Sequence, residues 1–298
     1  MKRIIPILLI AISTVSLVCA QPPAGEPQRN EFYAMDTNFN DGKARSPEET
    51  AKLLKELGYS GYGFVGMANI PQWLAALDKE GLKLYSIYVG VDIDSGKIDP
   101  TILQAVEQLR GRPTVLWVYT NSKKFKPSDA GGDDAAVPLL RELADRAHDA
   151  GLKIALYPHI SNWVETILDA VRVSEKVNRR NLGASFNLCH HLKILGEEGV
   201  EQALMNAAPY LLQVQINGAD SGDTKQMGWD KLIQPLDVGS YDVSQVLRVV
   251  RRIRYAGPIA LQGYGIKGDT PEILKRSIEG WNDLWSKLPA RPQRTRSN

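Results

Sequence analysis

Short apolar segments recur along the chain and alternate with amphipathic ones. Eight of the apolar segments are rich in Val, Ile, Leu, Tyr and Phe, and several are almost continuously apolar, as strands buried on both faces of a parallel sheet are. They cover residues 31–39, 60–65, 83–91, 114–120, 153–159, 183–188, 211–217 and 258–264. The pattern predicts eight β-strands.

The amphipathic stretches between them carry helix start and stop signals. The first begins with Ser46 as N-cap, Pro47 at the first helical position and Glu49 three residues after the cap, and Gly58 ends it. The other helices are predicted over residues 70–79, 101–109, 136–150, 163–177, 200–208, 243–255 and 271–288. Eight strands alternating with eight helices, without a break in composition, predict the α/β class and a single (β/α)8 TIM barrel.

A doubly wound open sheet is the alternative architecture. Such a sheet typically carries a glycine-rich phosphate loop after its first strand. Here that turn reads Asp36-Thr37-Asn38-Phe39-Asn40 and contains no glycine. The barrel is therefore the preferred prediction.

The first twenty residues read as a signal peptide. Lys2 and Arg3 precede a short apolar core, and Val18 and Ala20 are the small residues before a cleavage site after Ala20. An uncleaved anchor and a lipid on Cys19 are the alternatives. Beyond residues 1–20, we expect a Pro-rich linker (21–30), the barrel (31–290) and a disordered polar tail (291–298). The expected location is periplasmic or secreted.

The composition narrows the classes of partner. With 43% hydrophobic and 23% charged residues, the chain is typical of a globular domain and excludes a collagen-like or disulfide-dense protein. The formal net charge is +2, and without Lys2 and Arg3 the 34 basic residues equal the 34 acidic ones. We therefore expect no nucleic acid and, after signal cleavage, no membrane as partner. Cys189 would then have no disulfide partner within the chain and is expected to be a buried thiol.

Three of the four histidines fall where predicted strands end. In a TIM barrel the active site lies at the carboxyl ends of the strands, so His159, His190 and His191 are candidates for it. Neighbours in a strand point to opposite sides, so His190 and His191 should not both face the barrel axis. His148 lies on the polar face of a predicted helix and is expected to be solvated.

The same strand ends are rich in amides and aromatic rings. Amides can read hydroxyl groups as donor or acceptor, and flat rings cover the C–H face of a sugar, so this chemistry favours a neutral polyol over a phosphate. The candidate substrate-binding residues are Asp36, Asn38, Trp117, Tyr119, Tyr157, Trp163, Asn187, Gln215, Asn217, Gln262 and Tyr264. The long glycine-containing loop over residues 217–241 is a candidate lid.

Four segments carry a family resemblance. They are residues 150–159 (AGLKIALYPH), 183–190 (GASFNLCH), 234–242 (QPLDVGSYD) and 255–262 (YAGPIALQ). Through them the chain resembles the xylose isomerase-like TIM barrel superfamily, often labelled sugar phosphate isomerase/epimerase, as a divergent exported member. The likeness covers nearly the whole chain after the leader and implies the fold more specifically than the reaction.

The resemblance also implies a metal site, and the sequence departs from it. Members typically bind a divalent metal through a Glu, an Asp, a His and a Glu at the ends of strands five to eight. The matching residues here are Tyr157, Asn187, Gln215 and Gln262, which bring no negative charge, whereas Mg²⁺ and Mn²⁺ prefer carboxylate oxygens. No cofactor is therefore expected. A divalent metal (Mn, Zn or Mg), with Zn²⁺ on the two imidazoles, is the minority alternative.

We expect an exported isomerase or epimerase that abstracts a proton from an unphosphorylated sugar or keto-sugar. His159, His190 and Lys267 are the predicted catalytic residues, with Asp36 and Asp220 as the nearest carboxylates that could orient the imidazoles. A carbohydrate-binding pseudoenzyme that lost its metal and a lyase or hydratase on an oxidised sugar stay open as alternatives. A nuclease of the same superfamily is disfavoured by the missing ligands and the neutral charge.

Overall fold

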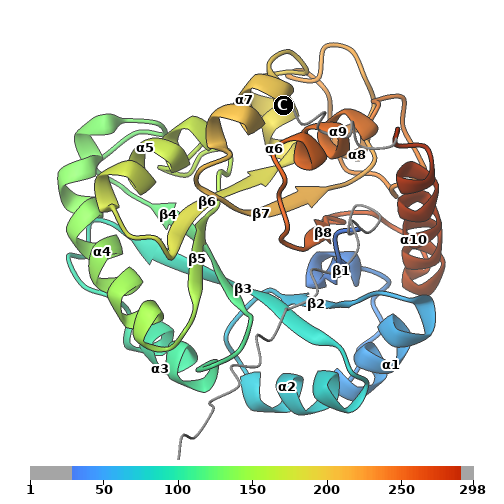
Figure 1. Ribbon diagram of the computed structural model, residues 1–298, viewed down its shortest axis with the longest axis horizontal. Helices are drawn as coiled ribbons and strands as arrows, with labels where there is room; N and C mark the ends of the chain where they lie inside the picture. The colour runs from blue at the N-terminus through green and yellow to red at the C-terminus, as the bar shows by residue number, and fades with distance from the viewer. Residues whose placement is uncertain (1–28, 290–298) are drawn as a thin grey trace, which may run out of the picture.

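A computed structural model describes residues 29–289, so the predicted signal peptide, all but the last two residues of the linker, and the tail lie outside the described residues. Eight parallel strands close into one barrel, in which β8 pairs with β1 (Figure 1). The strands are β1 (Phe32–Met35), β2 (Gly61–Phe64), β3 (Lys83–Asp92), β4 (Val115–Asn121), β5 (Lys153–Leu156), β6 (Leu182–Asn187), β7 (Leu211–Ile216) and β8 (Ile259–Leu261). The predicted (β/α)8 barrel is confirmed.

Helices form a ring outside the strands (Figure 1). This outer ring comprises α1 (Pro47–Leu57), α2 (Ile70–Lys79), α3 (Pro100–Gln108), α4 (Asp133–Asp149), α5 (Ile167–Val177), α7 (Val200–Ala207), α9 (Ser244–Arg252) and α10 (Thr270–Ser286). The capping box predicted at Ser46 and Glu49 is present, and Gly58 ends α1 in the left-handed conformation. Two short helices, α6 (Leu188–Ile194) and α8 (Trp229–Leu232), and two 3-10 turns, η1 (Asp36–Asn38) and η2 (Ala130–Gly132), lie within the connections.

Several strands end earlier than the apolar pattern predicts, and the residues released form the site. β5 stops at Leu156 instead of residue 159, because Pro158 has no N–H to donate to the ladder. β6 stops at Asn187, whose side-chain oxygen accepts from the His190 amide and caps α6. His190 and His191 therefore follow the end of β6, as predicted, but they lie on the short helix α6 and not in strand conformation.

The barrel has two cores of different character. Between strands and helices lies a large aliphatic core. Inside the barrel, Tyr33, Trp117 and Tyr157 pack together, and polar side chains are hydrogen-bonded among them. Gln213 Nε2 donates to the Tyr33 hydroxyl (2.6 Å) and Trp117 Nε1 donates to Ser185 Oγ (3.1 Å). The second bond fixes Trp117, whose ring forms part of the floor of the site.

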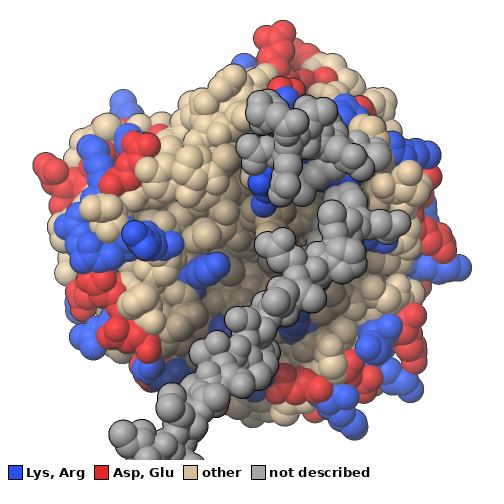
Figure 2. Space-filling model, in the orientation of Figure 1, with Lys and Arg blue, Asp and Glu red and all other residues tan. Residues whose placement is uncertain are grey.

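The surface carries both signs of charge. Figure 2 shows acidic and basic side chains interspersed around the periphery of the face it presents. This distribution provides no large field of one sign, in keeping with the balanced counts of acidic and basic residues. Within residues 29–289, the helices are all too short or too polar to span a bilayer.

Candidate active site

A cavity of about 560 Å³ opens at the carboxyl ends of the strands, where the sequence predicts the site. Its volume lies within the range of small-molecule pockets, about 300–1,000 Å³. Its walls are Asp36, Thr37, Phe39, Asn40, Val65, Tyr88, Trp117, Tyr157, His159, Ile160, His190, Trp229, Ile233, Gln262 and Tyr264. Asp36 is the sole charged residue among these fifteen, and there is no Lys or Arg.

Two imidazoles from consecutive connections lie against each other in this cavity. The ring centroids of His159, which follows β5, and His190, on α6, are 4.2 Å apart. His159 Nδ1 lies 2.7 Å from the carbonyl oxygen of Ile160, which can only accept, so this nitrogen carries the proton and Nε2 is left as an acceptor. The Ile160 amide points at His190 Nδ1 across 3.5 Å, which leaves His190 Nε2 as the donor.

Both rings are held neutral. Burial lowers the pKa of His159, partly opposed by the hydrogen bond to the Ile160 carbonyl. Burial lowers the pKa of His190 further, and repulsion by His159 adds to the effect. At neutral pH the pair therefore presents one unprotonated nitrogen and one N–H, which are the two states that proton transfer needs.

Asp36 lies on the opposite wall, because β1 and β5 are four strands apart in either direction around the barrel. Its Oδ1 accepts a hydrogen bond from the Tyr62 hydroxyl (2.5 Å). Burial raises the pKa of Asp36, and the bonds from Tyr62 and the Val65 backbone partly counter the rise. Asp220, the other predicted carboxylate, does not line the cavity and pairs with Lys231 instead.

Gln262, where the resemblance implies a carboxylate ligand, presents the wrong atom to a cation. Its Oε1 accepts from Thr37 Oγ1 (2.5 Å), the Gly263 amide (3.0 Å) and the Tyr264 amide (3.3 Å). Backbone amides can only donate, so the orientation of the side chain is fixed. Because Oε1 is fully used, Nε2 is the atom left to face the cavity, and an N–H donor repels a metal ion.

The amide oxygens at two other positions of the implied metal set also accept hydrogen bonds within the protein. Asn187 Oδ1 accepts from the His190 amide (3.2 Å) and Cys189 Sγ (3.0 Å). The network assigns Gln215 Nε2 as donor to the Phe186 carbonyl (2.8 Å), with its oxygen accepting from Gln213 Nε2 (3.0 Å). The remaining position is the Tyr157 phenol, whose pKa burial raises far above its usual value.

The residues present therefore do not fit the usual divalent ion. Three neutral amides with occupied oxygens and a protonated phenol cannot replace three carboxylates and a histidine. His159 and His190 are adjacent, but within residues 29–289 no three His, Cys, Asp or Glu residues come together as a candidate metal site. What the arrangement offers is a general base, a set of N–H donors and one carboxyl group.

Half of the fourteen predicted site residues line the cavity. They are Asp36, Trp117, Tyr157, His159, His190, Gln262 and Tyr264. The other seven, which do not line it, are Asn38, Tyr119, Trp163, Asn187, Gln215, Asn217 and Lys267. Lys267 is exposed on the loop after β8. Tyr119 stacks on Tyr88, which itself reaches the cavity.

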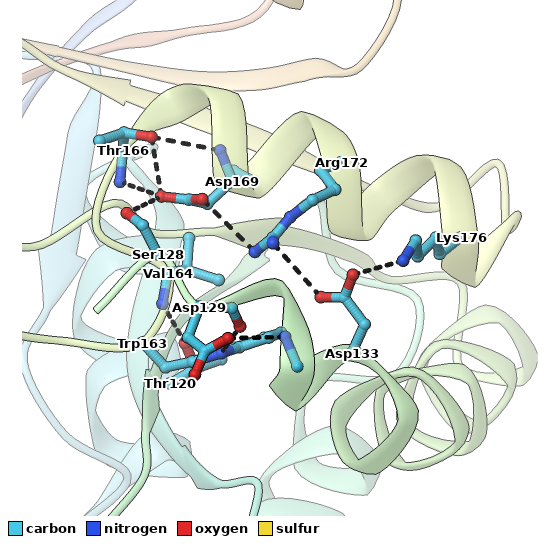
Figure 3. A network of polar contacts seen from close by, with 12 residues as sticks. Thr120, Ser128, Asp129, Asp133, Trp163, Val164, Thr166, Asp169, Arg172 and Lys176 are labelled. Atoms are coloured by element: carbon cyan, nitrogen blue, oxygen red, sulfur yellow. Dashed lines mark hydrogen bonds and ion pairs between the residues drawn. The ribbon is translucent and has the colours of Figure 1, made fainter. Parts of the chain in front are cut away.

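Two of the four amides that do not line the cavity, together with Trp163, hold the scaffold instead. Asn38 Nδ2 donates to the Met35 and Leu261 carbonyls and joins the first strand to the last. Asn217 donates to the carbonyls of Gly218 and Leu232 and holds the long loop. Trp163 is buried, and its Nε1 donates to the Asp129 carbonyl (2.8 Å), beside a network of polar contacts between α4 and α5 (Figure 3).

Eight lining residues were not predicted. They are Thr37, Phe39, Asn40, Val65, Tyr88, Ile160, Trp229 and Ile233. The sequence contained a signal for Tyr88, because every second residue of β3 faces the inside of the barrel, and Ser86, Tyr88 and Gly90 are such residues. Trp229 and Ile233 belong to the long loop, which folds over the barrel through α8 and a β-bridge between Gly218 and Gln234. Its contribution to the cavity wall keeps the lid prediction open.

Comparisons with known proteins agree with this architecture. A family model described as the xylose isomerase-like TIM barrel matches residues 51–284. A ketose 3-epimerase of Arthrobacter globiformis is 25% identical over 208 residues, which are 65% of this chain and 67% of that protein.

Among solved structures, a D-allulose 3-epimerase from Methylomonas sp. in complex with D-allulose matches with a TM-score of 0.67 and 17% identity over 87% of this chain and 98% of that one. A 3-keto-D-glucoside 4-epimerase from E. coli matches with the same TM-score and identity over 87% and 100%. The IOLI protein with a bound zinc atom matches with a TM-score of 0.69 and 14% identity over 88% and 100%. At these identities the structural likenesses show the fold.

Proposed function

The chain belongs to the xylose isomerase-like TIM barrel family, and we propose that it is an epimerase or isomerase acting on a neutral sugar or keto-sugar without a bound metal. One observation carries the proposal: two neutral imidazoles, one with Nε2 unprotonated and the other with Nε2 protonated, share a cavity with the amide donor of Gln262. The ketose 3-epimerase related in sequence supports the same reaction class.

The walls support an uncharged substrate. Phosphate and carboxylate groups are normally bound by Arg, Lys or helix N-termini, and no Lys or Arg lines the cavity. Aromatic rings form its floor, with Trp117 and Tyr157 centroids 3.9 Å apart and Tyr88 4.9 Å from Trp117. A hydroxylated ring with C–H faces suits this lining better than an anion does.

The proposed reaction begins with His159 Nε2 removing the proton from the carbon beside the substrate's carbonyl. The C–H bonding pair moves toward the carbonyl, and the oxygen gains negative charge as the enediolate forms. The N–H groups of Gln262 and His190 can donate to that oxygen, which is the stabilisation that a metal gives elsewhere in the family. The Thr37 hydroxyl and two backbone amides hold Gln262 in the donor orientation.

Asp36 supplies the return proton in this proposal. It lies on the wall opposite His159, so a proton removed from one face of the carbon can be replaced on the other, which inverts the centre. His159 and Asp36 together then hold one proton before and after turnover, and burial shifts the pKa of Asp36 upward, as this role requires.

A carbohydrate-binding protein without catalysis is the second candidate. The occupied amide oxygens at the implied metal positions favour it, because they remove the family's usual means of stabilising an enediolate. Export is part of the main proposal and is supported by the signal-like pattern of residues 1–20.

The test is hydrogen exchange followed by NMR. The protein is incubated in D₂O with a panel of ketohexoses and 3-keto-glucosides, alongside His159→Ala, His190→Ala and the exposed control His148→Ala. Exchange at a carbon beside the carbonyl by the wild type and His148→Ala, but not by the other two, supports an epimerase. Elimination products would identify a lyase instead. Binding without exchange or product would identify the non-catalytic alternative.

A further inference from the structure

The mouth of the cavity carries exposed aromatic surface that a single buried sugar ring does not need. Six large hydrophobic side chains are exposed within residues 29–289, and three of them, Val65, Trp229 and Tyr264, line this one cavity. Tyr264 is 66% exposed and Trp229 is 36% exposed, and they are the two aromatic members of the six. Apolar surface gathered at one site marks a place where a ligand or partner binds.

These side chains come from separate connections that meet at the mouth. Val65 follows β2, Trp229 begins α8 in the loop after β7, and Tyr264 follows β8. None of them is needed to fill either core, so folding alone does not account for them. Their shared feature is the opening of the cavity.

The rim is continuous with the catalytic pair. The Trp229 ring centroid lies 5.2 Å from that of His190, and His190 lies 4.2 Å from His159. A ligand stacked on Trp229 would therefore lie next to the two imidazoles, close enough for a directly linked sugar ring to reach them. Between the aromatic groups, Thr37 and Asn40 add uncharged polar surface, so the outer wall has the same neutral and aromatic character as the floor.

We propose that the rim formed by Val65, Trp229 and Tyr264 binds a second ring, so that the substrate is a neutral glycoside of two linked sugars rather than a free monosaccharide. The inference rests on the proposed function and specifies its substrate class. The inner ring, which carries the reacting carbon, occupies the floor beside His159. The outer ring lies against Trp229 and Tyr264, where the exposed faces of the two aromatic side chains can cover its C–H surface.

Calorimetric titration of the full chain tests the proposal with defined probes. Methyl glucoside is compared with trehalose, maltose, cellobiose and laminaribiose on the wild type, Trp229→Ala, Tyr264→Ala and the matched control Leu168→Ala. Leu168 is 50% exposed on α5 and does not line the cavity. We expect at least one disaccharide to bind about tenfold or more tighter than methyl glucoside, and each rim substitution to weaken it about tenfold. Each rim substitution should weaken the disaccharide more than it weakens methyl glucoside, and Leu168→Ala, outside the cavity, should match the wild type.

Other outcomes separate this inference from the proposed function. Equal binding of both probe sizes, unaffected by the rim substitutions, would overturn the second-ring site while leaving sugar binding intact. Absence of binding by every sugar, together with no exchange in the D₂O assay, would overturn both proposals. A concentration-dependent dimer that dissociates in Trp229→Ala would show that the rim contacts a second copy and would also overturn the inference. Unchanged thermal unfolding of the rim variants verifies that they are folded.

Discussion

Replacing His191 should make the protein less sensitive to acid. His191 lies on α6 beside His190, the proposed catalytic residue, but lines a separate space of about 10 Å³ near Phe186 and Glu165. It is 6% exposed, and its Nε2 has no hydrogen-bond partner within residues 29–289. Burial lowers the pKa of His191 to about 4 from its usual 6.5.

The sign and size of the effect follow from these two pKa values. The unfolded chain takes up a proton near pH 6.5, whereas the folded protein resists protonation until about pH 4, so folding stability falls as the pH drops through this interval. Above pH 6.5 both states are neutral and the histidine adds no pH dependence. At about pH 5 the difference amounts to about 2 kcal/mol of unfolding free energy.

Urea unfolding at about pH 7.5 and about pH 5 measures this contribution. The wild type should lose about 2 kcal/mol more than His191→Gln between the two pH values. The exposed His148→Gln is the control and should lose as much as the wild type. Identical pH dependence in wild type and His191→Gln would refute the reasoning, because it would mean that the folded protein protonates His191 as readily as the unfolded chain.

Three further predictions concern the proposed catalytic pair, the amide donor and the scaffold. His159→Ala should lower turnover about 10²–10⁴-fold while sugar binding persists, measured by exchange kinetics and calorimetry. Gln262→Glu replaces the inward N–H by an oxygen and should lower kcat about 10²-fold, whereas prior dialysis of the wild type against a chelator should leave its rate unchanged; chelator-sensitive activity would contradict the metal-free assignment. The side chain of Asp133 is 3% exposed and lies between Arg172 and Lys176 (Figure 3). Asp133→Ala should therefore lower the free energy of unfolding by about 3–5 kcal/mol. The exposed Asp145→Ala, which breaks the ion pair with Arg179, should change stability far less in the same denaturation assay.

The amides show that residue type alone does not predict which side chain faces the cavity. Asn187, Gln215 and Gln262 all lie at the carboxyl ends of strands and were predicted to contact substrate. Each uses its oxygen within the protein, but Gln262 alone lines the cavity. Its oxygen is satisfied by amides of the following two residues, which turns the nitrogen inward. The orientation of the Gln262 amide depends on which hydrogen-bond donors lie nearby in the folded protein, and the sequence alone does not reveal them.

The strand ends illustrate a second limit. The apolar pattern continues through residue 159 in β5 and residue 188 in β6, although the ladders stop at Leu156 and Asn187. Pro158 was a readable signal for the first of these endings. The Asn187 cap, which places His190 on a helix and beside His159, depends on a local competition between strand and helix that periodicity alone does not resolve.

The order of apolar and amphipathic segments determined the barrel, because eight strands that each bury both faces and each precede a helix have few other ways to close. Residue type alone also determined that the implied metal positions lack carboxylates. Tertiary structure decided which polar groups share one cavity, which nitrogen of each histidine is free, and that Trp229 from a distant loop lies against His190. These features depend on distances between groups far apart in the chain, and only closure of the barrel sets those distances.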